Sequence, residues 1–153
     1  NIQKILSYSQ NFTFVSNKAS MSFEKCKILI VDDEPDVIEI LSYNFSKNGF
    51  KVFSEQDGLS AYLSLDKIKP DIIILDVMMP YMDGILMCKQ VKRNVLYNKI
   101  PVIFLSAATP KYVSEAASEM NEHYLSKPIR FNILLDKVNE VLKEKITIND
   151  QCV

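Results

Sequence analysis

Polar residues that could do chemistry follow four short apolar runs in this chain. They are an acidic pair, a lone carboxylate, a hydroxyl and a lysine before a proline: Asp32-Asp33, Asp76, Ser106 and Lys127-Pro128. Because the carboxyl ends of parallel strands lie on one edge of a sheet, we expect these groups to converge on a single pocket. Carboxylates, a hydroxyl and an ammonium together suit a divalent cation and a phosphoryl group.

The carboxylates define the chemistry of this pocket. Asp32, Asp33 and Asp76 would repel one another, so without a counter-ion at least one of their pKa values should rise. Mg²⁺ (or Mn²⁺) would remove the conflict, since it takes oxygen ligands and keeps waters that a phosphate can replace. A carboxylate can also attack phosphorus and form an aspartyl phosphate. Asp76 is the best candidate because it stands alone and heads the loop 77–84.

The remaining two groups would assist such a transfer. The ammonium of Lys127, with the cation, would neutralise charge on the phosphoryl oxygens, and the Ser106 hydroxyl could donate a hydrogen bond to one of them. Each group also has an ordinary explanation when taken singly. An acidic pair before proline often only begins a helix, and a lone Asp, Ser or Lys-Pro often only ends a strand.

The bulk composition fits one globular domain. The chain has 153 residues, of which 48% are hydrophobic and 24% charged, and its net charge is -1. This charge balance lacks the excess of lysine and arginine that is typical of a nucleic-acid-binding protein. No apolar run approaches the roughly 18 residues that a membrane helix needs. We therefore expect neither nucleic acid nor membrane as a direct partner, and a cytoplasmic location.

Cysteine and histidine offer little chemistry. The three cysteines are far apart, odd in number and form no C-x-x-C motif: Cys26, Cys88 and Cys152. This favours free thiols in a reducing compartment over disulfides or a zinc site. The single histidine, His123, has no cysteine or second histidine nearby, and we expect it to be structural.

Five strand-like runs must position the polar groups. They are 27–31, 50–53, 71–75, 101–105 and 123–126, and the third is almost wholly apolar, as in a sheet covered on both faces. Helical apolar stripes alternate with them. The first helix is expected to begin at Pro35 and end at Asn48, and the second carries Ala61, Leu65 and Ile68 and ends before Pro70. The other three are expected from Gly84 through Val95, across 113–120, and from Leu134 to a frayed end near Lys145.

This alternation predicts an α/β protein built from right-handed βαβ units. The compact arrangement for five strands is a doubly wound parallel sheet in the order 2-1-3-4-5, a flavodoxin-like three-layer sandwich. That order places the two acid-bearing strands side by side. We expect residues 1–22 to be an N-terminal extension or linker, residues 23–145 the folded domain, and residues 146–153 a C-terminal tail. Met21 resembles an initiating methionine, and a short helix around Ile2-Leu6 is an alternative within the extension.

Four stretches together resemble the receiver domain of response regulators in two-component signalling. They are ILIVDDE at 28–34, ILDVMMPYMDG at 74–84, IPVIFLSA at 100–107 and YLSKP at 124–128. The resemblance runs from about Lys25 to Lys145, and the motifs are jointly specific. The sequence departs from the usual receiver pattern at two places. Receivers often carry Gly-Ala before the fifth strand, where this chain has Met120-Asn121. The fourth helix also contains Thr109-Pro110 near its start.

The resemblance implies roles residue by residue. Asp76 matches the phosphoacceptor, Asp33 the direct magnesium ligand and Asp32 the carboxylate acting mainly through water. The backbone carbonyl of Met78 would complete the metal site, and Lys127 matches the phosphate-binding lysine. The same family usually has a cis peptide bond between that lysine and the following proline.

A conformational switch is also implied. Ser106 matches the switch hydroxyl, which would move toward a phosphoryl group on Asp76. Tyr124 matches the switch aromatic ring, which would then turn inward. The surface around the fourth helix, fifth strand and fifth helix would change as a result, and partners would respond to it. A half-buried aromatic ring with only a structural role is the alternative for Tyr124.

The implied partners are a histidine kinase or histidine phosphotransfer protein, and a downstream effector or an output domain absent from this chain. A phosphorylation-dependent dimer is compatible with the resemblance. The domain would promote its own phosphorylation and slow dephosphorylation, and would not be an enzyme acting on an outside substrate. Neither Met78 nor Ala108, at the positions that tune hydrolysis, carries a side chain that could orient an attacking water.

Three other functions remain open at this point. A magnesium-dependent phosphatase with an aspartyl nucleophile usually shows Asp-x-Asp, whereas Met78 stands at the second position here. A flavin-binding protein of the same fold would need a phosphate loop after the first strand, where this chain has acids. A receiver that acts mainly as an interaction scaffold is the third alternative.

Overall fold

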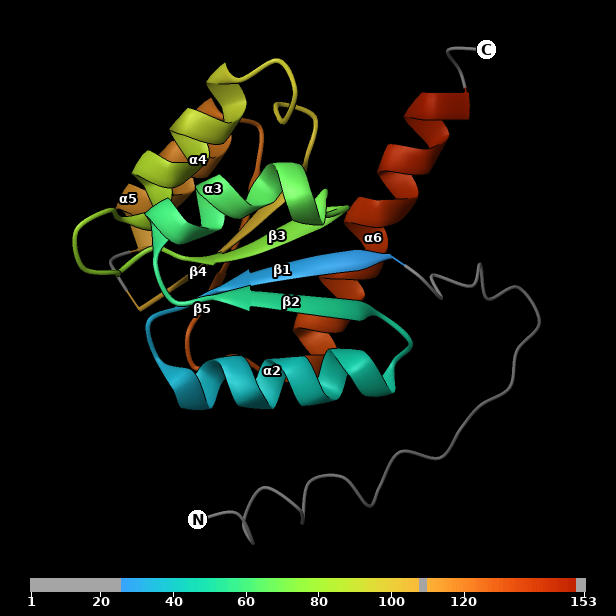
Figure 1. Cartoon of the computed structure of the whole chain (residues 1–153), viewed down its shortest axis with the longest axis horizontal. Helices are drawn as coiled ribbons and strands as arrows, with labels where there is room; N and C mark the ends of the chain where they lie inside the picture. Colours follow the sequence, from blue (N-terminus) through green and yellow to red (C-terminus); the bar gives the residue numbers. More distant parts are fainter. Residues whose placement is uncertain (1–25, 108–109, 151–153) are drawn as a thin grey trace, which may run out of the picture.

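The computed structural model describes residues 26–107 and 110–150, in which strands and helices alternate along the chain (Figure 1). The elements are β1 (Lys27–Val31), α2 (Pro35–Lys47), β2 (Lys51–Glu55), α3 (Gly58–Ile68), β3 (Ile72–Asp76), α4 (Gly84–Arg93), β4 (Val102–Ser106), α5 (Pro110–Glu119), β5 (His123–Ser126) and α6 (Phe131–Asp150).

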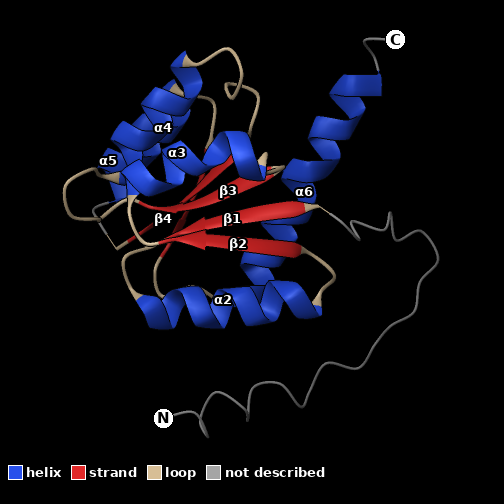
Figure 2. Cartoon of the chain, in the orientation of Figure 1, coloured by secondary structure: helices blue, strands red, loops and turns tan. Residues whose placement is uncertain are grey.

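The strands form one parallel sheet of five in the order β2-β1-β3-β4-β5. Helices cover both faces of it, and Figure 2 shows the strands enclosed between two helical layers. This confirms the predicted doubly wound, flavodoxin-like α/β fold. In this order β1 and β3 are neighbours at the point where the winding reverses, so the loops that follow them open at the same place.

Alternation along the central strands divides the core into two layers. Successive side chains of a strand point to opposite faces. Leu29, Ile73 and Phe104 therefore pack under α3, α4 and α5. Ile28, Ile74 and the rest of the second set pack against α2 and α6. All five residues of β3 are buried, which explains why its sequence is so continuously apolar.

Local chemistry fixes where the helices begin. Pro35 stands at the first turn of α2, where its missing N–H costs nothing. The side chains of Asp57 and Asp83 accept hydrogen bonds from the backbone N–H groups of Ser60 and Leu86 and cap α3 and α4. These caps set the directions in which the chain leaves the edge formed by the carboxyl ends of the strands.

Several boundaries differ from those expected. α4 ends at Arg93, so Val95 lies beyond the helix and is 83% exposed. α6 continues to Asp150, five residues past the expected end at Lys145, and Figure 1 shows it projecting beyond the sheet. The strands β2, β3 and β4 each start one residue later than expected. The helix considered near Ile2 lies outside the described residues.

Tyr81 and Asn121 are among the described residues that adopt positive φ. Asn121, at φ 55°, lies in the turn between α5 and β5, where receivers often carry Gly-Ala. Asparagine tolerates this left-handed region better than most residues, so the departure costs little. Tyr81, at φ 68°, stands at the tip of the β3–α4 loop with its ring fully exposed.

Within the described ranges, every helix falls short of the length and apolarity that crossing a membrane requires.

We predict that Gly84→Ala destabilises the protein, because a Cβ at residue 84 would lie 2.2 Å from the backbone oxygen of Asp76. Either α4 or the end of β3 must move, and overpacking of this kind costs about 1–3 kcal/mol. Urea unfolding followed by circular dichroism measures the loss.

Gly58→Ala is the matched control. A Cβ at residue 58 would meet the side chain and the backbone oxygen of Met82 at 3.2 Å, a tight contact but far milder than the 2.2 Å approach at Gly84. We expect a change in the free energy of unfolding well below that of Gly84→Ala. Equal losses for the two variants would show that the close approach to Asp76 is not the cause.

Candidate phosphorylation and metal site

Strand pairing brings the three acids together. Val31 pairs with Leu75 in the β1–β3 register, so Asp32 and Asp76 occupy the next positions on adjacent strands. The ladder bond from Val77 N–H to the Leu105 carbonyl continues the pairing on the other side of β3. Ligand oxygens of Asp32, Asp33 and Asp76 all lie within 4.8 Å of one another. The ends of β1 and β3, which are far apart in the sequence, therefore bring their acids to one place.

Two of these acids are buried. Asp32 is 1% exposed and Asp76 is 2% exposed, whereas Asp33 is more accessible. Asp32 Oδ1 accepts a hydrogen bond from the backbone N–H of Glu34 at 2.9 Å. Asp76 Oδ1 accepts one from the backbone N–H of Met78 at 3.3 Å. Both carboxylates are thus oriented by the first turn of the loop that follows their strand.

Lys127 supplies the positive charge. The hydrogen bond from its backbone N–H to the carbonyl of Ser106 extends the pairing of β5 with β4 and fixes the residue at the site. Its Nζ lies 2.9 Å from Asp32 Oδ2 and 3.5 Å from Asp76 Oδ2. The Lys127-Pro128 peptide bond is cis, as predicted. The ammonium therefore bridges the two buried carboxylates.

Electrostatics of the site follow from burial and crowding. Burial, followed by the negative charge of Asp32, raises the pKa of Asp76 to about 6, although Lys127 and the Met78 N–H act in the opposite direction. Burial alone would lower the pKa of Lys127, but its hydrogen bond to Asp32 and the surrounding carboxylates raise that pKa above its ordinary value. The single positive charge of Lys127 does not neutralise the negative charge of the three acids.

Ser106 and Tyr124 lie on neighbouring strands. Ser106 is the last residue of β4, is 3% exposed and pairs with Ser126, while Tyr124 pairs with Phe104. Because side chains alternate along strands, Ser106 and Tyr124 point to the same face of the sheet. Tyr124 is 37% exposed and Met78 is 63% exposed. Ala108, named from the sequence, lies outside the described residues.

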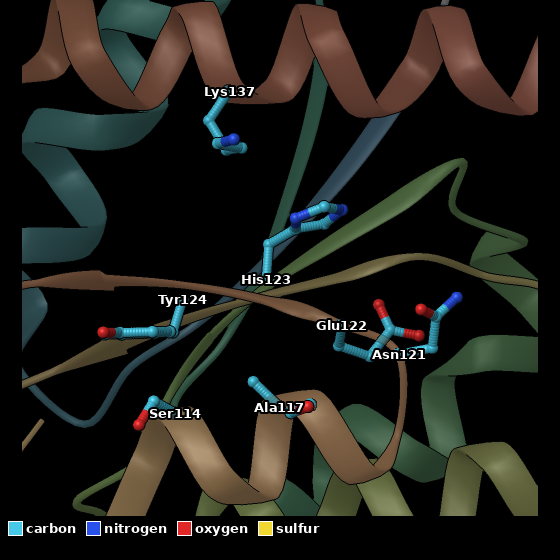
Figure 3. A pocket seen from close by; sticks show the side chains of 8 residues that line it. Ser114, Ala117, Asn121, Glu122, His123, Tyr124 and Lys137 are labelled. Carbon is cyan, nitrogen blue, oxygen red and sulfur yellow. The ribbon is translucent and has the colours of Figure 1, made fainter. Parts of the chain in front are cut away.

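Beside Tyr124 the surface is hollowed. A groove runs over β5 between α5 and α6, and its lining includes Ser114, Ala117, Asn121, Glu122, His123, Tyr124 and Lys137. Figure 3 shows His123 directed toward Lys137 of α6 and Ser114 and Ala117 rising from α5 on the opposite side. The groove adjoins the face to which Tyr124 belongs and is separate from the acidic edge.

Two ionic contacts were not identified from the sequence. The carboxylate of Glu34 accepts a hydrogen bond from Lys127 Nζ at 3.4 Å, although the sequence suggested only a helix start there. Glu122, with a side chain 7% exposed, pairs with Lys92 and accepts a hydrogen bond from the Val102 N–H at 2.6 Å. No local pattern indicates either contact, since each joins residues distant in the chain.

The acids suit a divalent cation. Their oxygens are the donors that Mg²⁺ prefers, and the excess of negative charge over the single ammonium favours a cation at this place. The raised pKa of Asp76 points the same way, because it reflects burial of the carboxyl and then repulsion from Asp32, which Lys127 only partly offsets.

Comparison with known proteins agrees with the geometry. Residues 28–139 match the family model of the response regulator receiver domain. The alkaline phosphatase synthesis transcriptional regulatory protein PhoP of Bacillus subtilis (strain 168) is 34% identical over 118 residues, which are 76% of this chain and 48% of that protein. The chain therefore spans about half the length of this curated relative.

Solved structures are similar over the same region. A putative response regulator from Chloroflexus aurantiacus J-10-fl is 31% identical, with a TM-score of 0.73 over 78% of this chain and 98% of that one. The chemotaxis protein CheY4 of Vibrio cholerae is 28% identical, with a TM-score of 0.72 over 76% of this chain and 98% of that one.

We predict that Asp76→Asn stabilises the protein at neutral pH in metal-free buffer. The folded-state pKa of about 6 exceeds the ordinary value of about 3.9. Below pH 4 the carboxyl is protonated in both folded and unfolded states and contributes nothing. As the pH rises from 4 through 6, the ionised form costs the wild type up to about 3 kcal/mol, at 1.4 kcal/mol per pH unit.

The free energy of unfolding, measured between pH 4 and 8 with EDTA, tests this. The advantage of Asp76→Asn should grow as the pH rises from 4 through 6, level off above that, and shrink when Mg²⁺ replaces EDTA. Asp57→Ala is the contrasting control, because hydrogen bonds from Ser60 lower the pKa of Asp57, so the ionised form stabilises the fold. A wild type at least as stable as Asp76→Asn at pH 7.5 would contradict the prediction.

Proposed function

Because this chain belongs to the family of response regulator receiver domains, we propose that it accepts a phosphoryl group on Asp76 and relays a signal through the resulting change of shape. The family is that of two-component signalling. The observation that carries the proposal is the convergence of Asp32, Asp33 and Asp76 within 4.8 Å, with Lys127 at 3.5 Å from Asp76. These are the groups that a phosphoryl transfer to a carboxylate requires.

In the proposed step a carboxylate oxygen of Asp76 attacks phosphorus. The donor is a phosphohistidine of a histidine kinase or histidine phosphotransfer protein. A new O–P bond forms, the N–P bond to the imidazole breaks, and the imidazole leaves with the electron pair. Hydrolysis later returns phosphate and the free carboxylate. The protein is changed by its own reaction, and no outside substrate is turned over.

The residues divide the work of charge neutralisation. Asp33, Asp32, Asp76 and the backbone carbonyl of Met78 would hold Mg²⁺ or Mn²⁺, which when bound neutralises charge on the phosphoryl oxygens. The Lys127 ammonium, 3.5 Å from Asp76 Oδ2, would bind a phosphoryl oxygen. Ser106, at the end of the adjacent strand, would donate its hydroxyl to another.

The proposed output is a change around Tyr124. Movement of the Ser106 hydroxyl toward the phosphoryl group would leave space on the face that Ser106 and Tyr124 share. Tyr124, which is 37% exposed and lines the groove between α5 and α6, would then turn inward. Turning the ring would reshape that groove, which a downstream effector or an output domain could then recognise, or which could form a phosphorylation-dependent dimer.

We assign the receiver to residues 23–145 and expect it in the cytoplasm, where two-component kinases transfer phosphate. Two functions compete with it. A receiver used mainly as a scaffold would not need Lys127 held between two buried acids. A magnesium-dependent aspartyl phosphatase would need a second acid where Met78 stands. The complete set of acceptor, acids and lysine supports phosphorylation above both.

We predict that acetyl phosphate labels the protein once, on Asp76, when Mg²⁺ is present. Intact-mass spectrometry should show the phosphoryl group on the wild type, and EDTA or Asp76→Asn should abolish it. Asp66→Asn, a change in an exposed aspartate of α3, is the control and should label normally. Labelling that survives in Asp76→Asn would sink the assignment of the acceptor.

We further predict that Ser106→Ala uncouples the switch from the chemistry. Without the hydroxyl, the protein should still be labelled on Asp76, more slowly by roughly tenfold if one charge-assisted hydrogen bond of about 1.5 kcal/mol is lost. The amide resonances of β5 and α5 should then shift little on phosphorylation, as followed by ¹H–¹⁵N NMR. Full wild-type shifts in labelled Ser106→Ala would show that another group couples Asp76 to Tyr124.

A further inference from the structure

The carboxylate of Glu34 has a partner that its own helix does not require. Glu34 is the N-cap of α2, where a side-chain oxygen can accept a hydrogen bond from the first turn, yet it makes no such cap. Its carboxylate accepts a hydrogen bond from Lys127 Nζ at 3.4 Å, across 93 residues of sequence. Its backbone N–H bonds to Asp32 Oδ1, which holds Glu34 at the mouth of the acidic site.

The ammonium of Lys127 is directed by this contact. It donates hydrogen bonds to Asp32 at 2.9 Å and to Glu34 at 3.4 Å, whereas Asp76 is reached only as an ion pair at 3.5 Å. An ammonium has three N–H donors, so the groups around it compete for them. Glu34 therefore helps to hold Lys127 in a position that serves the resting acids.

Exposure distinguishes the partners of Lys127. The side chains of Asp32 and Asp76 are 1% and 3% exposed, while that of Glu34 is 64% exposed. Breaking a buried pair leaves an uncompensated buried charge, but an exposed carboxylate is rehydrated at once. Of these three contacts, the one with Glu34 is the easiest to give up.

We propose that Glu34 is a positioning residue that restrains Lys127 at the mouth of the site and competes with an incoming phosphoryl group for its ammonium. This inference rests on the function proposed for Asp76. When a phosphoryl oxygen takes a donor of Lys127, Glu34 is displaced into solvent and Asp32 keeps its bond. Glu34 thereby lowers the readiness of the site to accept phosphate.

Two variants separate contact from charge. Glu34→Gln removes the negative charge, while Glu34→Asp keeps the charge but shortens the reach toward Lys127. Asp36→Asn is the matched control, because Asp36 is an exposed acid in the first turn of the same helix. Among the described residues, the ion pairs of Lys127 do not include Asp36. All four proteins are titrated with beryllofluoride, a phosphoryl mimic, in excess Mg²⁺ by calorimetry, and are labelled with acetyl phosphate.

Both Glu34 variants should bind beryllofluoride roughly two- to fivefold more tightly than the wild type, the value of an exposed ion pair. Acetyl phosphate labelling should accelerate by a similar factor, and Asp36→Asn should change little. In a Lys127→Met background the effect of Glu34→Gln should fall to that of the Asp36→Asn control, because the contact no longer exists.

The inference is overturned if both Glu34 variants bind beryllofluoride as the wild type does. It is also overturned if Asp36→Asn has an equal effect, or if the full gain of Glu34→Gln persists without Lys127, since only the general field of negative charge would then matter. Normal labelling of Asp76 in the wild type with no effect at Glu34 refutes this inference alone. A wild type that neither binds beryllofluoride nor is labelled refutes the proposed function, and this inference with it.

Discussion

Repulsion among carboxylates at the carboxyl edge of the sheet is the constraint on which the rest of the structure depends. Asp32 and Asp76 occupy corresponding positions on adjacent strands and are almost fully buried, so neither can turn toward solvent to escape the other. A single ammonium, on Lys127, lies between them. The result is a place where added positive charge is favoured and where burial, followed by repulsion from Asp32, raises the pKa of Asp76 to about 6. The proposed reactivity toward a cation and an electrophilic phosphoryl group would draw on this enforced crowding.

The apolar strands sustain the crowding. Both faces of β3 are covered, and its five residues are buried, so the strand cannot shift to relieve the repulsion at its end without opening two packed layers. Gly84 completes the constraint from the other side, because α4 begins so close to the Asp76 carbonyl that a methyl group would not fit. The loop between them is short and tightly held at both ends. Stability of the core thus maintains an unfavourable electrostatic arrangement at the edge.

Much of this was predictable because it follows from periodicity and from the ends of strands. Apolar runs of strand length alternating with helical stripes define the doubly wound sheet, and the strand order brings the acids and Lys127 together. Boundaries were less predictable. Hydrogen bonds between strands involve only backbone groups, so a polar side chain does not end a strand. Asp76 and Ser106 are therefore the last residues of β3 and β4, although the apolar runs end one residue earlier. Val95 fits the apolar spacing of α4, yet the helix ends at Arg93 and Val95 is exposed. The role of Glu34 as a partner of Lys127 could not be read from a local pattern, since it depends on packing between distant loops.

The carboxylates that contact Lys127 differ in exposure, and this difference determines which contact an incoming group would replace first. Asp32 and Asp76 are both buried, but Asp32 lies closer to the Lys127 ammonium, and Glu34 contacts that ammonium with a side chain that is 64% exposed. A group arriving from solvent meets the weakest contact of Lys127 first, and taking it leaves the buried bond to Asp32 intact. The ammonium can therefore change one partner without any buried charge losing its own. Since desolvated charges are costly to separate and exposed ones are not, this order of burial allows the site to exchange ligands while the fold around it stays fixed.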